Sequence, residues 1–248
     1  MRVAVISDIH GNAHALEAVL ADIDRQAPDL TLNLGDHLSG PFYCARAADI
    51  LIPRGFPSIS GNHDRWLTAP EKGVLGRLEK LALQSLTQEH LDWISSLPPT
   101  RVIENEIFMC HATPADDLTN WLDDFNELGQ VVLQPKAQIV AHAKDINYPV
   151  ILCGHTHVPR TVSISGGRIV VNPGSVGYPG FAFDRDGTHF AWNAGAPHAS
   201  YAILEKGSAG WSVTHRAVPY DFEAAAREAD EAGVVAVANA LRTGWLPG

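Results

Sequence analysis

The feature that most constrains the fold is a pattern that recurs along the chain: a short apolar segment ends in a polar cluster that carries aspartate or histidine. Apolar runs of this length are typical of strands buried on both faces. In open α/β sheets, ligands bind outside the carboxyl ends of the strands, so we expect these clusters to converge in space. The clusters are Asp8-Ile9-His10, Gly35-Asp36, Gly61-Asn62-His63-Asp64, His111 and Gly154-His155-Thr156-His157.

Strands and helices alternate in the first part of the chain. Arg2–Ser7 predicts a strand, and Ala13–Arg25 has apolar residues at a helical period. This alternation predicts an α/β fold. It continues with a strand at Leu30–Leu34, a helix at Tyr43–Ile52, a strand around Pro57–Ser60, and two or three short helices within Arg65–Leu97, of which Gln88–Leu97 has Thr87 as its candidate N-cap.

The second part of the chain predicts mainly paired strands. If the chain stays extended through Gly154-His155-Thr156-His157, its two imidazoles lie on one side. Tyr178–Pro197 is rich in glycine, proline and aromatic residues and has no clear period. The predicted pairs are Thr100–Glu104 with Glu106–Cys110, Thr161–Ser165 with Arg168–Asn172 around a two-residue Gly166-Gly167 turn, and Tyr201–Glu205 with Trp211–Ala217.

We expect residues 1–248 to form a single domain. Residues 112–148 are polar and irregular, and we interpret them as a cap-like insertion over the site. We expect helical pieces there at Trp121-Leu122 and Asp123-Asp124, with Asp116-Asp117 and Asp123-Asp124 forming a solvated helix face. Phe222–Leu241 is alanine-rich, so we predict a C-terminal helical segment around residues 222–243.

The formal net charge of −10 argues against broad binding to nucleic acid or to an anionic membrane. An anionic substrate would need a local source of positive charge, such as a metal. The N-terminus lacks a signal-peptide pattern and no apolar run approaches the roughly 18 residues of a membrane span, so we expect a cytoplasmic protein. Cys44, Cys110 and Cys153 form no C-x-x-C pair, and core thiols are favoured over ligands.

The polar clusters combine carboxylate, imidazole and amide groups without thiolate, which suits Mn, Fe or Zn. They offer more ligands than one tetrahedral metal needs. Two metals about 3.5 to 4 Å apart that share a bridging carboxylate would use such a set. The candidates are Asp8, His10, Asp36, Asn62, His63, Asp64, His111, His155 and His157.

The motifs D-x-H, G-D, G-N-H-D, a lone strand-end histidine and G-H-T-H, in this order, resemble the calcineurin-like metallophosphoesterase superfamily. Asn172-Pro173-Gly174-Ser175 and Val218-Pro219-Tyr220-Asp221 further resemble its small bacterial, phosphodiesterase-type members. Two places depart from the family: Ala112 follows His111 where many members have glycine, and Phe181–Pro197 is longer than in compact members, which affects substrate access. The resemblance implies an α/β sandwich of two mixed sheets packed face to face with helices outside.

The resemblance also implies roles for the candidate residues. Asp8, His10 and His157 would bind the first of two divalent metals (Mn, Fe, Zn or Ni), Asp36 would bridge, and Asn62, His111 and His155 would bind the second. Two divalent cations against two carboxylates and a bridging hydroxide leave excess positive charge, which attracts phosphate. The implied reaction is phosphoester hydrolysis by in-line attack on a small phosphodiester or nucleotide-type substrate.

His63 is the expected non-ligand, and an imidazole beside the scissile bond can protonate the leaving alkoxide. Asp64 either orients His63 or caps the following helix, and the sequence leaves both open. His14 and His37 lie beside motifs, but a solvated or packed role is favoured for both. Arg46, Arg65 and Arg160 are equally placed to contact phosphate.

Other activities fit parts of this pattern. A runner-up is a protein serine/threonine or diadenosine-polyphosphate phosphatase. A non-catalytic interaction module of the same fold would tend to lose ligands, whereas all seven ligand positions and His63 are present here. A DNA nuclease conflicts with the acidic balance. The sequence does not indicate the oligomeric state.

Overall fold

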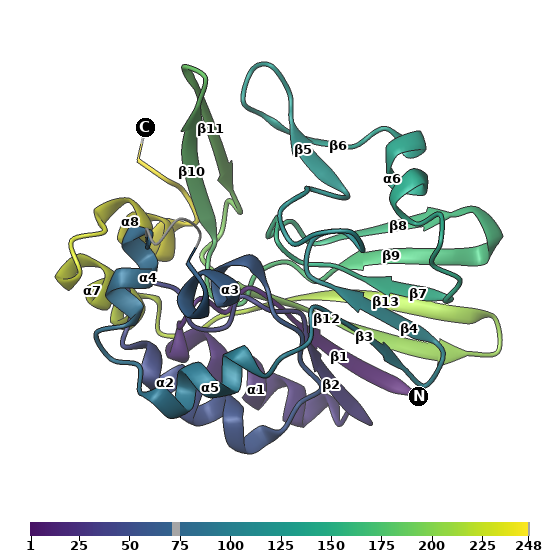
Figure 1. Ribbon diagram of the computed structural model, residues 1–248, viewed down its shortest axis with the longest axis horizontal. Coiled ribbons are helices and arrows are strands. Elements are labelled where there is room, and N and C mark those ends of the chain that lie inside the picture. Colours follow the sequence, from purple (N-terminus) through teal and green to yellow (C-terminus); the bar gives the residue numbers. More distant parts are fainter. Residues whose placement is uncertain (71–74, 248) are drawn as a thin grey trace.

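Two β-sheets packed face to face form the centre of the computed structural model, which describes residues 1–70 and 75–247 (Figure 1). Sheet A has the strand order β13-β12-β1-β2, and sheet B has the order β3-β4-β7-β9-β8. Each sheet mixes parallel and antiparallel pairs. The strands are β1 (Arg2–Ile6), β2 (Leu30–Asn33), β12 (Ala199–Gly207) and β13 (Gly210–Val218) in sheet A, and β3 (Thr100–Ile103), β4 (Ile107–Cys110), β7 (Val150–Leu152), β8 (Arg160–Ile164) and β9 (Arg168–Asn172) in sheet B.

Alternate residues of the central strands face opposite layers of the molecule. In β1, Val3 and Val5 pack between the sheets, while Ala4 and Ile6 pack against the helices outside sheet A. Because Val3–Ile6 are buried on both faces of sheet A, this part of β1 is a continuous apolar run rather than an alternation of apolar and polar residues.

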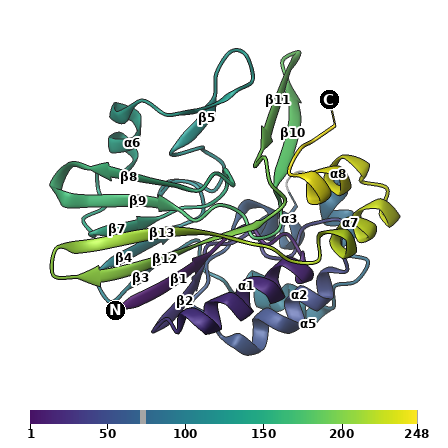
Figure 2. The same ribbon diagram turned by 180° about the vertical axis from the view of Figure 1, so that it is seen from behind.

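Helices cover the outer face of sheet A in both views (Figures 1 and 2). The α1 helix is amphipathic, and Asn12 caps it by accepting a hydrogen bond from the backbone of Ala15. Thr87 caps α5 in the same way through the backbone of His90. The elements of this layer are α1 (Ala13–Gln26), α2 (Cys44–Leu51), the 3₁₀ turn η1 (Ile52–Arg54), α3 (Asn62–Thr68), α4 (Arg77–Ala82), α5 (Gln88–Ser95), α7 (Phe222–Glu231) and α8 (Val235–Thr243).

The outer face of sheet B packs against α6 (Lys136–His142) and the segment around Trp121. Trp121 is almost completely buried, and its indole nitrogen donates to the carbonyl of Ile139. Cys110 and Cys153 lie in this cluster, and burial raises the pKa of both thiols.

Two hairpins rise from the same end of the sheet pair (Figure 1). One consists of β5 (Asp123–Phe125) and β6 (Val131–Leu133), and the other of β10 (Gly180–Arg185) and β11 (Thr188–Asn193). The segment Tyr178–Pro197, whose sequence has no clear period, thus contains the second hairpin. Its strands pair with each other in a separate two-stranded sheet, and only Phe190 is buried in β11, so no apolar run marks this strand in the sequence.

The predicted sandwich of two mixed sheets flanked by helices is confirmed. Three local predictions were wrong. Pro57–Ser60 forms only an isolated bridge between Ser58 and Asn33. The β8–β9 connection has three residues (η3, Ser165–Gly167), with Gly166 and Gly167 at positive φ. Trp121 to Asp124 are not helical, because Asp123 begins β5.

Within the predicted helical region Arg65–Leu97, residues 71–74 lie outside the described residues. No helix in the described part of the chain is long and apolar enough to cross a membrane.

Candidate metal centre

The polar clusters converge because backbone hydrogen bonds join the loops that follow the strands. Asp8 donates its backbone N–H to Gly35 (3.0 Å), and His10 donates to Asp36 (2.9 Å). Gly154 donates to the carbonyl of His111 (2.7 Å). The four strand ends β1, β2, β4 and β7 therefore present their side chains to one space.

Most of the predicted ligands have left-handed backbone conformations. His155 and His157 have φ values of 66° and 60°, so the chain is not extended there as predicted. Side chains other than glycine rarely adopt these angles, and such strain concentrates at functional sites. The sharp turns direct the two imidazoles into different clusters. The other ligands in this region are Asp8 (54°), His10 (51°) and Asp36 (55°).

Two glycines allow the close approach of these loops. A Cβ atom at Gly154 would collide with Ser7 Oγ and approach Asp8 Oδ2 to 2.8 Å. A Cβ atom at Gly61 would collide with the carboxylate of Asp36. The glycines of two motifs are thus required by packing at the site.

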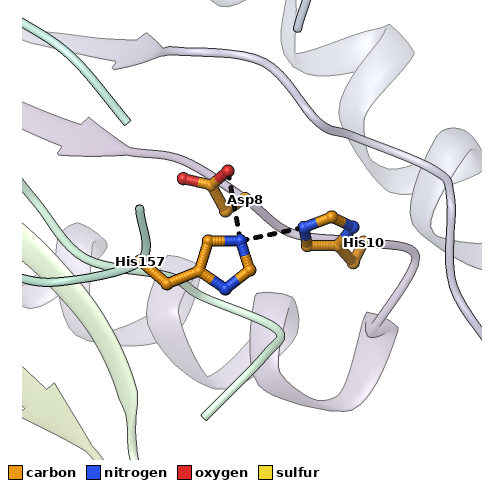
Figure 3. Close-up of side chains that lie close together, drawn as sticks. All are labelled: Asp8, His10 and His157. Carbon is orange, nitrogen blue, oxygen red and sulfur yellow. Dashed lines mark hydrogen bonds and ion pairs between the residues drawn. The ribbon is translucent and has the colours of Figure 1, made fainter. Parts of the chain in front are cut away.

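The first cluster contains Asp8, His10 and His157, whose potential ligand atoms lie within 4.8 Å of one another (Figure 3). His157 Nε2 lies 3.1 Å from His10 Nε2 and 3.5 Å from Asp8 Oδ1. His10 donates from Nδ1 to the carbonyl of Ser39 (2.8 Å). All three side chains are buried.

The second cluster contains Asp36, His111 and His155, and the amide of Asn62 lies beside it. His111 Nε2 lies 3.3 Å from Asp36 Oδ2, and His111 Nδ1 donates to Leu34 O. Asn62 Oδ1 lies 3.1 Å from His111 Nε2 and 3.0 Å from His155 Nδ1. His155 Nε2 donates to Leu118 O (3.0 Å), so its Nδ1 is the atom that faces the cluster.

Asp36 lies between the two clusters. Its Oδ1 accepts the backbone N–H of His63 (2.9 Å), while Oδ2 lies 3.3 Å from His111 Nε2 and 3.9 Å from His10 Nε2. One carboxylate oxygen is therefore within reach of imidazoles from both clusters.

The first cluster fits a metal cation on its own geometry. His10 uses Nδ1–H for Ser39, so a neutral ring turns a lone pair from Nε2 towards His157 Nε2. Asp8 Oδ1 is buried and has no hydrogen-bond partner within the described residues. Burying hydrogen-bond acceptors without donors destabilises the folded protein, and a cation bound between these acceptors would stabilise it by pairing with them.

Burial and mutual charge shift the pKa values of these groups. Burial raises the pKa of Asp8, but His157 and His111 outweigh it and lower it to about 2. Burial lowers the pKa of His10 and of His155 to about 4, so both imidazoles are neutral at pH 7. His111 is the exception: despite burial, the nearby carboxylate of Asp36 raises its pKa to about 10. A metal must therefore displace a proton from His111.

His63 lies at the edge of this site and is held by a residue that the sequence did not indicate. Its Nδ1 lies 2.6 Å from Glu79 Oε1, and Ser39 Oγ donates to the same oxygen (2.6 Å). Burial lowers the pKa of His63, but Asp36 and Glu79 outweigh it and raise the pKa overall. His63 also has a potential ligand atom within 4.8 Å of His10 and Asp36.

Asp64 does not orient His63. The hydrogen bonds that its carboxylate accepts in the described structure come from the backbones of Asp36, His37 and Gly61 and from the ring of His37 (2.8 Å). The alternative interpretation, in which Asp64 caps the helix that follows, agrees with the hydrogen bond from the Gly61 backbone at the start of α3. His37 is fully buried, and its ring packs edge-on against Trp93 at 5.0 Å.

The three arginines considered for phosphate binding are each paired with a carboxylate. Arg46 pairs with Glu17, Arg65 with Asp117, and Arg160 with Asp123. The predicted solvated acidic face was wrong, because these acids have partners. Asp123 is buried beside Arg160, and Asp116 accepts hydrogen bonds from the backbones of Leu118 and Thr119.

Other supporting residues also lie outside the predicted ligand set. Asn172 donates to the carbonyl of Gly154 (2.7 Å) and Ser175 to that of Asp8 (2.7 Å), so both support ligand-bearing loops. The segment Asn172-Pro173-Gly174-Ser175 was a signal for them. For Glu79, which lies in a short amphipathic helix, no local signal exists. His14 pairs with Glu228 (2.8 Å), as a packed residue would.

A pocket of about 460 Å³ opens above the clusters. Its lining includes His10, Asp36, Asn62, His63, His155 and His157. The aromatic and acidic residues of its remaining lining are Trp66, Asp123, Asp124, Phe125, Tyr178, Phe181 and Phe183. Aliphatic and neutral polar side chains complete the lining: Leu78, Leu118, Asn120, Val131, Thr156, Val158 and Ala182. The site can thus hold a small molecule against the histidines and carboxylates.

Comparison with known proteins gives the following similarities. Residues 1–194 match the family model described as the calcineurin-like phosphoesterase superfamily domain. An uncharacterized protein of Methanocaldococcus jannaschii is 26% identical over 226 residues, which cover 82% of each chain. The crystal structure of a metallophosphoesterase from Sphaerobacter thermophilus is 27% identical, with a TM-score of 0.73 over 98% of this chain and 100% of that one.

Proposed function

The chain belongs to the calcineurin-like phosphoesterase superfamily, and we propose that it is a divalent-metal-dependent phosphoesterase with a dinuclear centre that hydrolyses a phosphodiester or nucleotide-type substrate. The observation that carries the proposal is the position of Asp36 Oδ2, which lies 3.3 Å from His111 Nε2 and 3.9 Å from His10 Nε2. A carboxylate shared between two ligand clusters is what a pair of metals requires.

The residues divide into two ligand sets around Asp36. Asp8, His10 and His157 would hold one metal, and Asn62, His111 and His155 the other. The bound cations would supply the positive charge that binds phosphate and would lower the pKa of a water molecule so that it can attack phosphorus. If the Asn62 amide were rotated, its nitrogen would donate hydrogen bonds to His111 Nε2 and His155 Nδ1. A bound cation would instead favour the orientation in which the amide oxygen faces the cluster.

His63 would donate the proton to the leaving alkoxide. Glu79 and Ser39 hold its Nδ1 side, which leaves Nε2 as the atom available to a substrate. A general acid in this position contributes about 10² to 10⁴ in rate. The ion pair between the pocket-lining His63 and the buried Glu79 also favours an enzyme over a non-catalytic interaction module.

The test is to load the purified protein with Mn²⁺, Ni²⁺, Zn²⁺ or Mg²⁺ and to measure bound metal and turnover together. The substrates are a phosphodiester, a phosphomonoester, a dinucleoside polyphosphate and a phosphopeptide. We expect about two metals per chain and the fastest turnover on the diester or nucleotide. Failure to bind metal, together with no turnover of any substrate, would contradict the proposal.

A further inference from the structure

We infer that the two hairpins β5–β6 and β10–β11 form an aromatic wall that selects substrates in which a single phosphate is esterified to a planar, uncharged group, such as a nucleoside. This inference rests on the proposed phosphoesterase function, because it assumes that the phosphate binds at the two ligand clusters. The aromatic wall consists of Phe125, Phe181 and Phe183.

The two hairpins meet through Phe125. Its ring lies edge-on to Phe181 at 6.3 Å and to Phe183 at 5.5 Å, while Phe181 and Phe183 are nearly parallel with an interplanar angle of 10°. The turn of the first hairpin also approaches the second, because a Cβ atom at Gly129 would come within 2.5 Å of His189 O. Two segments distant in the sequence therefore build one continuous aromatic surface.

This surface begins at the metal ligands themselves. Phe181 packs edge-on against His157 at 5.1 Å. Trp66, which also lines the pocket, packs edge-on against His63 at 4.7 Å. A molecule whose phosphate lies at the clusters must therefore extend between aromatic rings, and the volume of about 460 Å³ is in the range of small-ligand sites.

The exposure of the rings supports a ligand role. Phe183 is 39% exposed, and Phe125, Phe181 and Trp66 are partly exposed although they face the pocket. Exposed aromatic surface beside convergent polar groups is typical of a binding site, because a planar ligand can cover it by stacking.

The charge of the walls limits the number of phosphates. Asp124 and Asp123 line the pocket, with Asp123 paired to Arg160, and no lysine or arginine lines the pocket among the side chains that the structure describes, which leave out Arg185. Sites for polyphosphates depend on basic side chains away from the metals. Among these described side chains, a phosphate would find unpaired positive charge only from cations at the clusters, so we expect the rest of the substrate to be uncharged.

The test measures binding separately from turnover. With the Mn²⁺-loaded protein, calorimetry compares thymidine 5′-phosphate, phenyl phosphate and ribose 5-phosphate, which share one phosphate and differ in the planar group. We expect thymidine 5′-phosphate to bind about tenfold more tightly than ribose 5-phosphate, since one stacked base supports a gain of this size. If phenyl phosphate shows the same gain, the wall recognises planarity alone; equal binding of all three contradicts the inference.

Leucine substitutions remove stacking while they keep apolar volume. Phe125→Leu and Phe183→Leu, one in each hairpin, should each abolish most of this preference and leave ribose 5-phosphate binding unchanged. Phe222→Leu is the matched control, because Phe222 is partly exposed but packs on Tyr220 and His198, away from this pocket. Preference retained in both hairpin variants overturns the inference, and thermal unfolding checks that each variant is folded.

Turnover distinguishes this inference from the proposed function. A dinucleoside monophosphate should be hydrolysed with a higher kcat/KM than diadenosine tetraphosphate. Equal hydrolysis of esters with and without a planar group would leave the phosphoesterase standing and remove the aromatic selection. Selective binding of planar ligands without turnover of any ester would support the aromatic selection and contradict the proposed phosphoesterase function.

Discussion

Glu79 Oε1 lies 2.6 Å from His63 Nδ1, although the two residues are 16 positions apart and only His63 lies in a recognisable motif. The carboxylate is 3% exposed, and burial by itself would raise its pKa; the hydrogen bonds from His63 and Ser39 lower it instead. The pair holds the imidazole with one nitrogen towards Glu79 and the other available to the pocket.

Glu79→Gln should lower kcat about tenfold or more with little change in KM, because it removes the carboxylate charge that positions His63 and raises its pKa. The loss should be largest for alkyl leaving groups and small for p-nitrophenolate, which needs no proton. A plot of rate against leaving-group pKa checks this. Glu89→Gln, at an exposed position in the first turn of α5, is the control. A loss independent of the leaving group would indicate a merely structural role.

His63→Ala should keep the metal content and lower kcat about a hundredfold on esters with poor leaving groups. The reason is that His63 makes its polar contacts with Glu79 and Ser39, while each ligand cluster is complete without it. Metal analysis of the purified variant is the measurement. Loss of one metal would instead make His63 a ligand, together with His10 and Asp36.

Asp36→Asn should weaken the binding of both metals by at least about tenfold, because one carboxylate oxygen approaches both clusters. Asn62→Ala should weaken only one, since its amide approaches His111 and His155 alone among the ligand histidines. Calorimetric titration of the metal-free proteins with a divalent metal ion resolves the two sites. Retention of one unperturbed site in Asp36→Asn would contradict the bridging role.

Asp22 predicts a pH-dependent contribution to stability far from the site. It joins α1 to sheet A through Arg216 (2.7 Å) and Tyr201 (2.6 Å), and the hydrogen bond from Arg216 is the main reason that its pKa falls to about 2. Because the pKa of Asp22 in the folded protein lies below its ordinary value of 3.8, the stabilisation is present above about pH 4 and is lost as the pH falls towards 2.

Asp22→Asn should therefore lower the free energy of unfolding by about 2 kcal/mol at pH 7 and by much less near pH 2. Urea unfolding at both pH values measures the difference. Asp24→Asn, on the same helix but with a side chain 66% exposed, is the control and should have little effect at either pH. An equal loss for Asp22→Asn at both pH values would mean that packing, not charge, is responsible.

The sequence by itself predicted strands buried on both faces and the meeting of the motif residues, and its resemblance to a known superfamily implied the sandwich of two sheets. Runs such as Val3–Ile6 can satisfy both faces only between two layers, and strand ends in such sheets face a common edge. Once the strands pair, the residues that follow them are confined to the same edge of the sheets. The two clusters around Asp36 therefore follow from the order of local segments.

The tertiary structure alone decided the partners of those residues. Glu79 reaches His63 from a separate helix, Asp64 turns to His37, and Phe125 meets Phe183 across two hairpins. None of these contacts has a period or spacing in the sequence, because each depends on how distant segments pack. The strands and the positions of the motif residues along the chain are encoded locally, whereas the contacts of His63 and the walls of the pocket arise from long-range packing.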